Sequence, residues 1–169
     1  DTEFTWHDFV RRNNDELGAT WGNLGNRSGS FTHKNFEGTI PQPGLMTQSD
    51  VKLLAQIDVA FGPVGDLIGA CHFKQALGEV MALARDVNKY FDENAPWFEI
   101  KKDKARTGTI MYVTLRAIDS LKVLFAPFLP FTCQRLHRML GYSGDLLGKQ
   151  IMREYEESTR KHVALTYDY

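Results

Sequence analysis

Cys133 and His137 are one pair of residues in this sequence whose types and spacing could support chemistry. They are four positions apart, so on a helix they would share one face and could both ligate a metal ion. A zinc site needs three or four ligands, however, and the sequence has no second pair at this spacing. Because a buried cysteine usually behaves as a small hydrophobic residue, we predict no metal site.

The other side chains with catalytic potential do not form a constellation. The sequence has no glycine-rich phosphate loop, no Cys-x-x-Cys pair and no Gly-x-Ser-x-Gly elbow. Its carboxylates lie mostly as sequence neighbours on polar faces, as in Asp15–Glu16, Asp92–Glu93 and Glu156–Glu157. Such neighbours are typical of a solvated helix surface rather than of acid–base catalysis. The chain is therefore predicted to be a binding module without catalytic residues.

Asn23 and Arg27 are suited to recognition. They are four residues apart, so they would lie on one face of a helix. Asparagine both donates and accepts hydrogen bonds, and arginine presents a rigid fork of donors. Trp97, which follows Pro96, offers an aromatic face. Each also has a simpler interpretation that would be favoured if it stood alone: a surface amide, a surface or ion-paired cation, and a core side chain.

The composition allows one compact domain with a sizeable core. The chain has 169 residues, 43% of them hydrophobic, and a net charge of −1. A nucleic-acid-binding protein is typically basic overall, so any such surface must be a local patch or rely on stacking. Two cysteines and the absence of a signal-like start predict the reducing cytoplasm, and no apolar run is long enough to span a membrane.

Helical periodicity dominates the apolar residues. Thr5 and Asp8 resemble a capping box, so a first helix is expected to open near Trp6. Its apolar stripe includes Trp21 and Leu24, and we assign Trp21 to the core. Several glycines lie within the same stretch, so this helix needs tertiary packing to persist.

Prolines and glycines divide the rest of the chain. Loops are expected over residues 37–44 and 101–106. A second helix should be capped by Ser49 and be kinked or split at Gly62–Pro63. A third helix should end near Asn94, because Ala95 precedes Pro96 and is pushed out of helical geometry. Two more helices are expected, one including Ile110–Phe125 and a short one capped by Thr132.

These elements predict an all-α fold, a bundle of about five helices over residues 1–144. Residues 145–169 are expected to form a short irregular or extended C-terminal tail that packs on the bundle. Within that tail, Val163–Tyr167 could be a strand.

Two segments carry a family resemblance. The first runs from Trp21-Gly-Asn-Leu-Gly-Asn-Arg27 to the Pro41-Gln-Pro-Gly44 loop, and the second from Met81-Ala-Leu-Ala-Arg85 to Ala95-Pro-Trp97. Both resemble the C-terminal anticodon-binding domain of methionyl-tRNA synthetases, the α-helical bundle of class I synthetases. The resemblance covers residues 1–142 well and is weaker beyond, and the two motifs in this order are specific to that family.

The resemblance implies roles for five residues. Asn23 and Arg27 match the residues that read the first anticodon base, a cytosine, whose two acceptors and one amino donor suit this pair. Trp97 matches the tryptophan that stacks on an anticodon base, with Pro96 fixing its backbone. Lys34 falls where a basic residue can reach the anticodon loop. Recognition of an unpaired base by an aromatic face is the usual way in which single-stranded RNA is read.

The family further implies a tRNA with a CAU anticodon as partner, together with the catalytic domain of the same enzyme. The intact enzyme would attach methionine to tRNA using ATP and magnesium. No segment of this chain resembles the family's ATP-binding signatures, His-x-Gly-His and Lys-Met-Ser-Lys-Ser. The chain alone is therefore expected to bind no cofactor and to be inactive.

Two alternatives remain open from the sequence. The chain could be the anticodon domain of another class I synthetase, such as the valyl or cysteinyl enzyme. It could also be a standalone helical protein-interaction or dimerisation module that does not bind RNA, an interpretation that the near-neutral charge supports.

Overall fold

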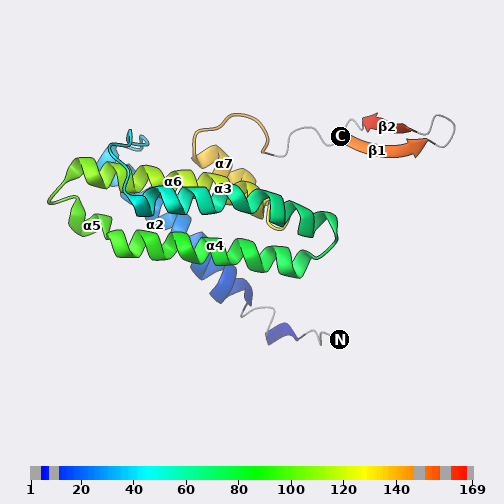
Figure 1. Cartoon of the computed structure of the whole chain (residues 1–169), viewed down its shortest axis with the longest axis horizontal. Coiled ribbons are helices and arrows are strands. Elements are labelled where there is room, and N and C mark those ends of the chain that lie inside the picture. The colour runs from blue at the N-terminus through cyan, green and yellow to red at the C-terminus, as the bar shows by residue number, and fades with distance from the viewer. Residues whose placement is uncertain (1–4, 8–11, 147–150, 157–160, 167–169) are drawn as a thin grey trace.

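Three long helices form the centre of the fold in the computed structural model, which describes residues 5–7, 12–146, 151–156 and 161–166. They are α3 (Gln48–Gly69), α4 (Phe73–Asn94) and α6 (Lys104–Phe125). Each packs against the other two, and Figure 1 shows them side by side along the long axis. Because α6 also receives other helices on its remaining sides, buried residues occur along its whole length.

Shorter elements surround this centre. The π-helix η1 (Arg12–Gly22) leads directly into α2 (Asn23–Phe36), and the two pack against α4 and α6 respectively. A single turn, α5 (Pro96–Glu99), joins α4 to α6, and α7 (Pro130–Met139) packs against α6. The predicted all-α bundle is confirmed. No helix of the described residues is long and apolar enough to cross a membrane.

Side-chain capping sets where α3 and α6 begin. Thr47, not Ser49, caps α3, because its side chain and that of Asp50 form a reciprocal capping box. The helix continues through Pro63 to Gly69, so it is not split there, and a kink at Pro63 stays a prediction. Asp103 starts α6 by accepting a hydrogen bond from the backbone N–H of Arg106, at 2.9 Å.

Two further boundaries concern prolines. The third helix ends at Asn94 as predicted, and Ala95 takes a left-handed conformation with a φ of 40°. The short helix α5 was not expected from the sequence. Pro96 opens it at the first helical position, where its missing N–H costs no hydrogen bond. Pro130 opens α7 in the same way, two residues before the expected cap.

The core lies where the helices meet, and Trp21 belongs to it as predicted. Its side chain is 3% exposed and its ring centroid lies 4.7 Å from that of Phe125. At the start of the chain, Trp6 and His7 are helical, whereas Asp8 lies outside the described residues.

The C-terminal segment contains an antiparallel hairpin of β1 (Ile151–Glu156) and β2 (Lys161–Thr166), with Ile151 opposite Thr166. β2 matches the strand interpretation of Val163–Tyr167, except that Tyr167 lies outside the described residues. The packing of residues 145–169 on the bundle stays a prediction.

We expect Gly29→Ala to stabilise the protein by up to about 1 kcal/mol, because alanine lowers the conformational entropy of the unfolded chain and favours the helix. A methyl group at Gly29 would meet no atom within 4 Å. The measurement is the free energy of unfolding in urea. Gly38→Ala is the control that should destabilise the protein, because the φ of Gly38 is 72°, which is left-handed, and a Cβ there would lie 3.2 Å from His33. A lower unfolding midpoint for Gly29→Ala than for wild type would contradict the expectation.

Candidate nucleic-acid interface

The outward face of α2 carries three of the predicted site residues. Asn23 is its first residue, Arg27 follows one turn later, and both are exposed. Lys34 is exposed seven residues further on, so it lies on the same face about 10 Å along the axis. The opposite face of the helix buries Leu24, Ser28 and Thr32. Burial of one face therefore fixes which side chains α2 presents to solvent.

Arg27 reaches from α2 to α4 and α5. Its guanidinium carbon lies 5.5 Å from the ring centroid of Trp97 and 5.2 Å from that of Phe91. One guanidinium nitrogen, Nη2, donates to the carboxylate of Asp92 at 2.6 Å. Both partners of this ion pair are substantially exposed, so it contributes at most about 1 kcal/mol to stability. Its main effect is to orient the arginine fork over the aromatic rings.

Trp97 is half-buried, so it is neither a plain core side chain nor a free surface one. Its ring meets Phe91 edge-on, with centroids 5.7 Å apart. Pro96 is buried and, together with the left-handed Ala95, sets the direction in which α5 leaves α4. The structure thus brings Arg27 and Trp97 into contact, with Asn23 one turn away and Pro96 adjacent. Their contact with an anticodon stays a prediction.

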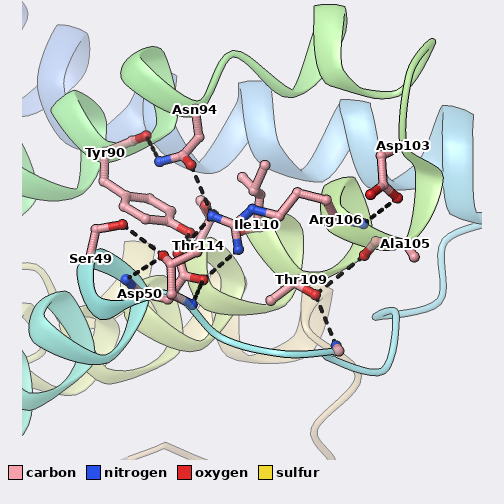
Figure 2. A network of polar contacts seen from close by, with 12 residues as sticks. Ser49, Asp50, Tyr90, Asn94, Asp103, Ala105, Arg106, Thr109, Ile110 and Thr114 are labelled. Carbon is pink, nitrogen blue, oxygen red and sulfur yellow. Dashed lines mark hydrogen bonds and ion pairs between the residues drawn. The ribbon is translucent and has the colours of Figure 1, made fainter.

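A buried ion pair holds the end of α4 from which α5 departs (Figure 2). Asp50 of α3 is completely buried and accepts hydrogen bonds from both terminal nitrogens of Arg106, from the Tyr90 hydroxyl at 2.6 Å and from the Thr47 N–H at 2.8 Å. The Asn94 amide oxygen also accepts from Arg106, at 3.0 Å, and its nitrogen donates to the carbonyl of Tyr90. The network ties together α3, α4 and α6 just before the turn that carries Trp97.

The network is ionic at neutral pH. Burial raises the pKa of Asp50, but hydrogen bonds from Arg106, Tyr90 and Thr47 outweigh it and hold that pKa at about 2. Burial and the hydrogen bond to Asp50 raise the pKa of Tyr90 well above its usual range. The hydrogen bond to Asp50 also raises the pKa of Arg106. Sequence reasoning missed this network, although Asp50 three residues after Thr47 carried a capping signal.

Two hydrogen bonds from one side chain of α4 position the start of α2. The side-chain nitrogen of Asn88 donates to the carbonyl oxygen of Thr20 at 2.9 Å and to that of Ala84 at 3.0 Å. The last turn of η1 is therefore fixed to α4 three residues before Asn23. The same two residues, Thr20 and Asn88, line a shallow surface depression. Its other lining residues are Ala19, Arg85, Lys89, Asp92 and Glu93.

Cys133 and His137 lie in different local environments: the cysteine thiol is buried, and the histidine ring faces a lysine ammonium. Burial raises the pKa of the Cys133 thiol to about 11, with nearby Lys122 acting weakly in the other direction. His137 places its Nδ1 3.0 Å from the buried Lys122 ammonium, which also donates to Asp119 at 2.5 Å. In the part of the chain that the structure describes, no three His, Cys, Asp or Glu side chains are grouped to hold a metal ion.

The all-α bundle is the fold that the resemblance implied for a class I synthetase anticodon-binding domain. The family described as the anticodon binding domain of methionyl tRNA ligase matches residues 40–160. This chain belongs to that family.

Individual relatives of this chain are also methionine–tRNA ligases. The methionine–tRNA ligase of Chloroflexus aggregans is 53% identical over 170 residues, covering 100% of this chain and 28% of that protein. The methionine–tRNA ligase of Thermomicrobium roseum is 52% identical, covering 99% of this chain and 28% of that protein. Among solved structures, Mycobacterium tuberculosis methionyl-tRNA synthetase in complex with methionyl-adenylate is similar with a TM-score of 0.80 and 30% identity, over 83% of this chain and 28% of that chain. This chain thus spans about 28% of the length of these relatives.

Family membership decides between the methionyl family and the valyl or cysteinyl alternative, in favour of the former. In each of these relatives the region that matches this chain is part of a longer synthetase.

Proposed function

We propose that this chain reads the CAU anticodon of methionine tRNA. The observation that carries the proposal is the placement of Arg27 over Trp97, 5.5 Å away, with Asn23 one turn along the same helix face. A base that stacks on the exposed part of the Trp97 ring would have its pairing edge beside the donors of Arg27 and, one helical turn away, the amide of Asn23.

Hydrogen-bond polarity supports cytosine as the base that would be selected. Arg27 can donate to the O2 and N3 acceptors of cytosine, and the Asn23 amide oxygen can accept from its amino group. Uracil replaces the N3 acceptor by an N–H and the amino group by a carbonyl, so donors would face a donor and an acceptor would face an acceptor. Groups left unpaired in this way disfavour the wrong base strongly.

The activity of the whole enzyme is part of the same proposal. The relatives are methionine–tRNA ligases, and this chain corresponds to about 28% of their length. We propose that it acts with the catalytic domain of such a ligase, which would use ATP and magnesium to attach methionine in the cytoplasm. The chain itself would supply recognition and no catalytic residue. Lys34 would contribute attraction for the phosphates of the anticodon loop.

The proposal is tested by titrating this chain with two RNA stem-loops that differ only in the first anticodon base, CAU and UAU. We expect a preference for CAU of about a hundredfold or more. Trp97→Ala should weaken binding of CAU by about 5- to 150-fold, the loss of roughly 1–3 kcal/mol of stacking. Trp97→Phe is the matched control, because it keeps an aromatic face. Equal binding of the two loops by wild type would contradict the proposal.

A further inference from the structure

Phe98 is an exposed aromatic side chain beside Trp97 that the recognition of the first base does not use. It is 61% exposed, whereas its neighbours Pro96 and Trp97 are buried and half-buried respectively. The ring centroids of Phe98 and Trp97 are 6.3 Å apart and the ring planes are inclined by 63°. Two aromatic platforms therefore stand next to each other on α5 with different orientations.

Exposed lysines follow Phe98 on the same turn. The backbone N–H of Lys101 donates to the carbonyl of Phe98, and that of Lys102 donates to the carbonyl of Glu99 at 2.8 Å. These hydrogen bonds continue the turn beyond α5, so the backbone of both lysines stays within one turn of Phe98. Both side chains are exposed.

The two carboxylates of this segment, Glu99 and Asp103, only partly offset the positive charge of Lys101, Lys102 and Lys104. The Asp103 carboxylate accepts a hydrogen bond from the Arg106 N–H at the start of α6, so it caps that helix. Glu99 is half-buried. Lys104, at the other side of Asp103, adds a third cation and lies over the ring of Phe36 at 5.9 Å. The surface beside Phe98 therefore combines an aromatic face with positive charge, which is the combination that binds single-stranded nucleic acid.

We propose that Phe98, Lys101 and Lys102 form a second nucleotide subsite. It takes the unpaired nucleotide next to the one on Trp97: the Phe98 ring stacks on its base, and the two lysines bind the flanking phosphates. The inference rests on the proposed function, and extends it from one base to two consecutive nucleotides. Stacked bases in a helix lie parallel and about 3.4 Å apart. Platforms inclined by 63° cannot hold two bases in that arrangement, so the loop is splayed at this point.

The test is the affinity of Phe98→Ala for the CAU and UAU stem-loops. Stacking tolerates any base, so we expect binding of CAU to weaken about 5- to 150-fold while the ratio of CAU to UAU affinity is retained. Phe131→Ala is the matched control, because Phe131 is 85% exposed but lies on α7. It should bind like wild type, and Phe98→Tyr should restore binding.

Two further readouts separate stacking from loss of structure. Replacing the middle adenine of the anticodon, or in a second RNA the nucleotide before the cytosine, by fluorescent 2-aminopurine reports stacking directly. Wild type should quench one of the two probes more than Phe98→Ala does. Lys101→Ala with Lys102→Ala should reduce the slope of log affinity against log salt by about 1.4, which is about 0.7 for each phosphate that a lysine no longer neutralises.

The outcomes distinguish this inference from the proposed function. If wild type prefers CAU but Phe98→Ala binds with unchanged affinity, the second subsite is refuted and anticodon reading stands. If Phe98→Ala loses the CAU preference as well as affinity, Phe98 acts through Trp97 and is not a separate subsite. If wild type binds neither loop, both proposals fail together.

Discussion

Arg27→Ala is expected to abolish the preference for CAU over UAU and to weaken binding of the CAU loop by about a hundredfold or more. The reason is that Arg27 supplies the donors for two of the three polar groups on the cytosine edge, and a buried edge left unpaired is strongly disfavoured. Binding of UAU should change much less, because the wild-type donors oppose that base. The measurement is the dissociation constant of each loop for wild type and variant.

The fold should tolerate this substitution. The pair between Arg27 and Asp92 is exposed on both sides, so its loss should lower the free energy of unfolding by less than about 1 kcal/mol. Arg135→Ala is a control of equal charge, since Arg135 is exposed on α7 and should leave the preference intact. If Arg27→Ala weakened both loops equally, Arg27 would be acting as a general cation on the phosphates and not as a reader of the base.

Asp50→Ala is expected to lower the free energy of unfolding by about 3–5 kcal/mol, a large part of the stability of an ordinary domain. The substitution leaves the Arg106 guanidinium, which is only 20% exposed, and the buried Tyr90 hydroxyl without their shared acceptor. Denaturant unfolding measures the loss. Asp58→Ala is the matched control on the same helix. It removes an exposed pair with Arg116 at 3.6 Å and should cost less than about 1 kcal/mol.

The pH dependence of stability is a second test of the role of the Asp50 carboxylate. The pKa of Asp50 falls from 3.8 to about 2 on folding, so ionised Asp50 stabilises the fold above pH 3.8. This contribution, about 2 kcal/mol, should disappear as the pH falls through the window from about 4 to 2. The difference in stability between wild type and Asp50→Ala should shrink in that window. A difference that stays constant down to pH 2 would contradict the ionic description of the network.

Local chemistry made some features predictable. The end of α4 at Asn94 followed from Ala95 and Pro96, because proline restricts the preceding residue whatever the fold. The shared face of Asn23 and Arg27 followed from helical periodicity. The burial of Trp21 followed from its place in an apolar stripe.

Tertiary contacts account for what the sequence did not show. Nothing in the local sequence of Arg27 indicates that it lies against Phe91 and Trp97 from other helices. Asp50 has the local signature of a capping residue, whereas its main partner, Arg106, was assigned to a charged loop. The exposure of Phe98 depends on how α5 leaves α4, and α5 itself was not expected.

The ion pair of Asp50 and Arg106 also constrains how this family can diverge. Replacing Asp50 leaves Arg106 and the Tyr90 hydroxyl without their shared acceptor, and replacing Arg106 leaves a buried carboxylate without its counter-charge, so either single substitution passes through a less stable intermediate protein. Replacing the whole group by apolar residues of similar volume need not be costly. Evolution should therefore change Asp50 and Arg106 together or leave both unchanged.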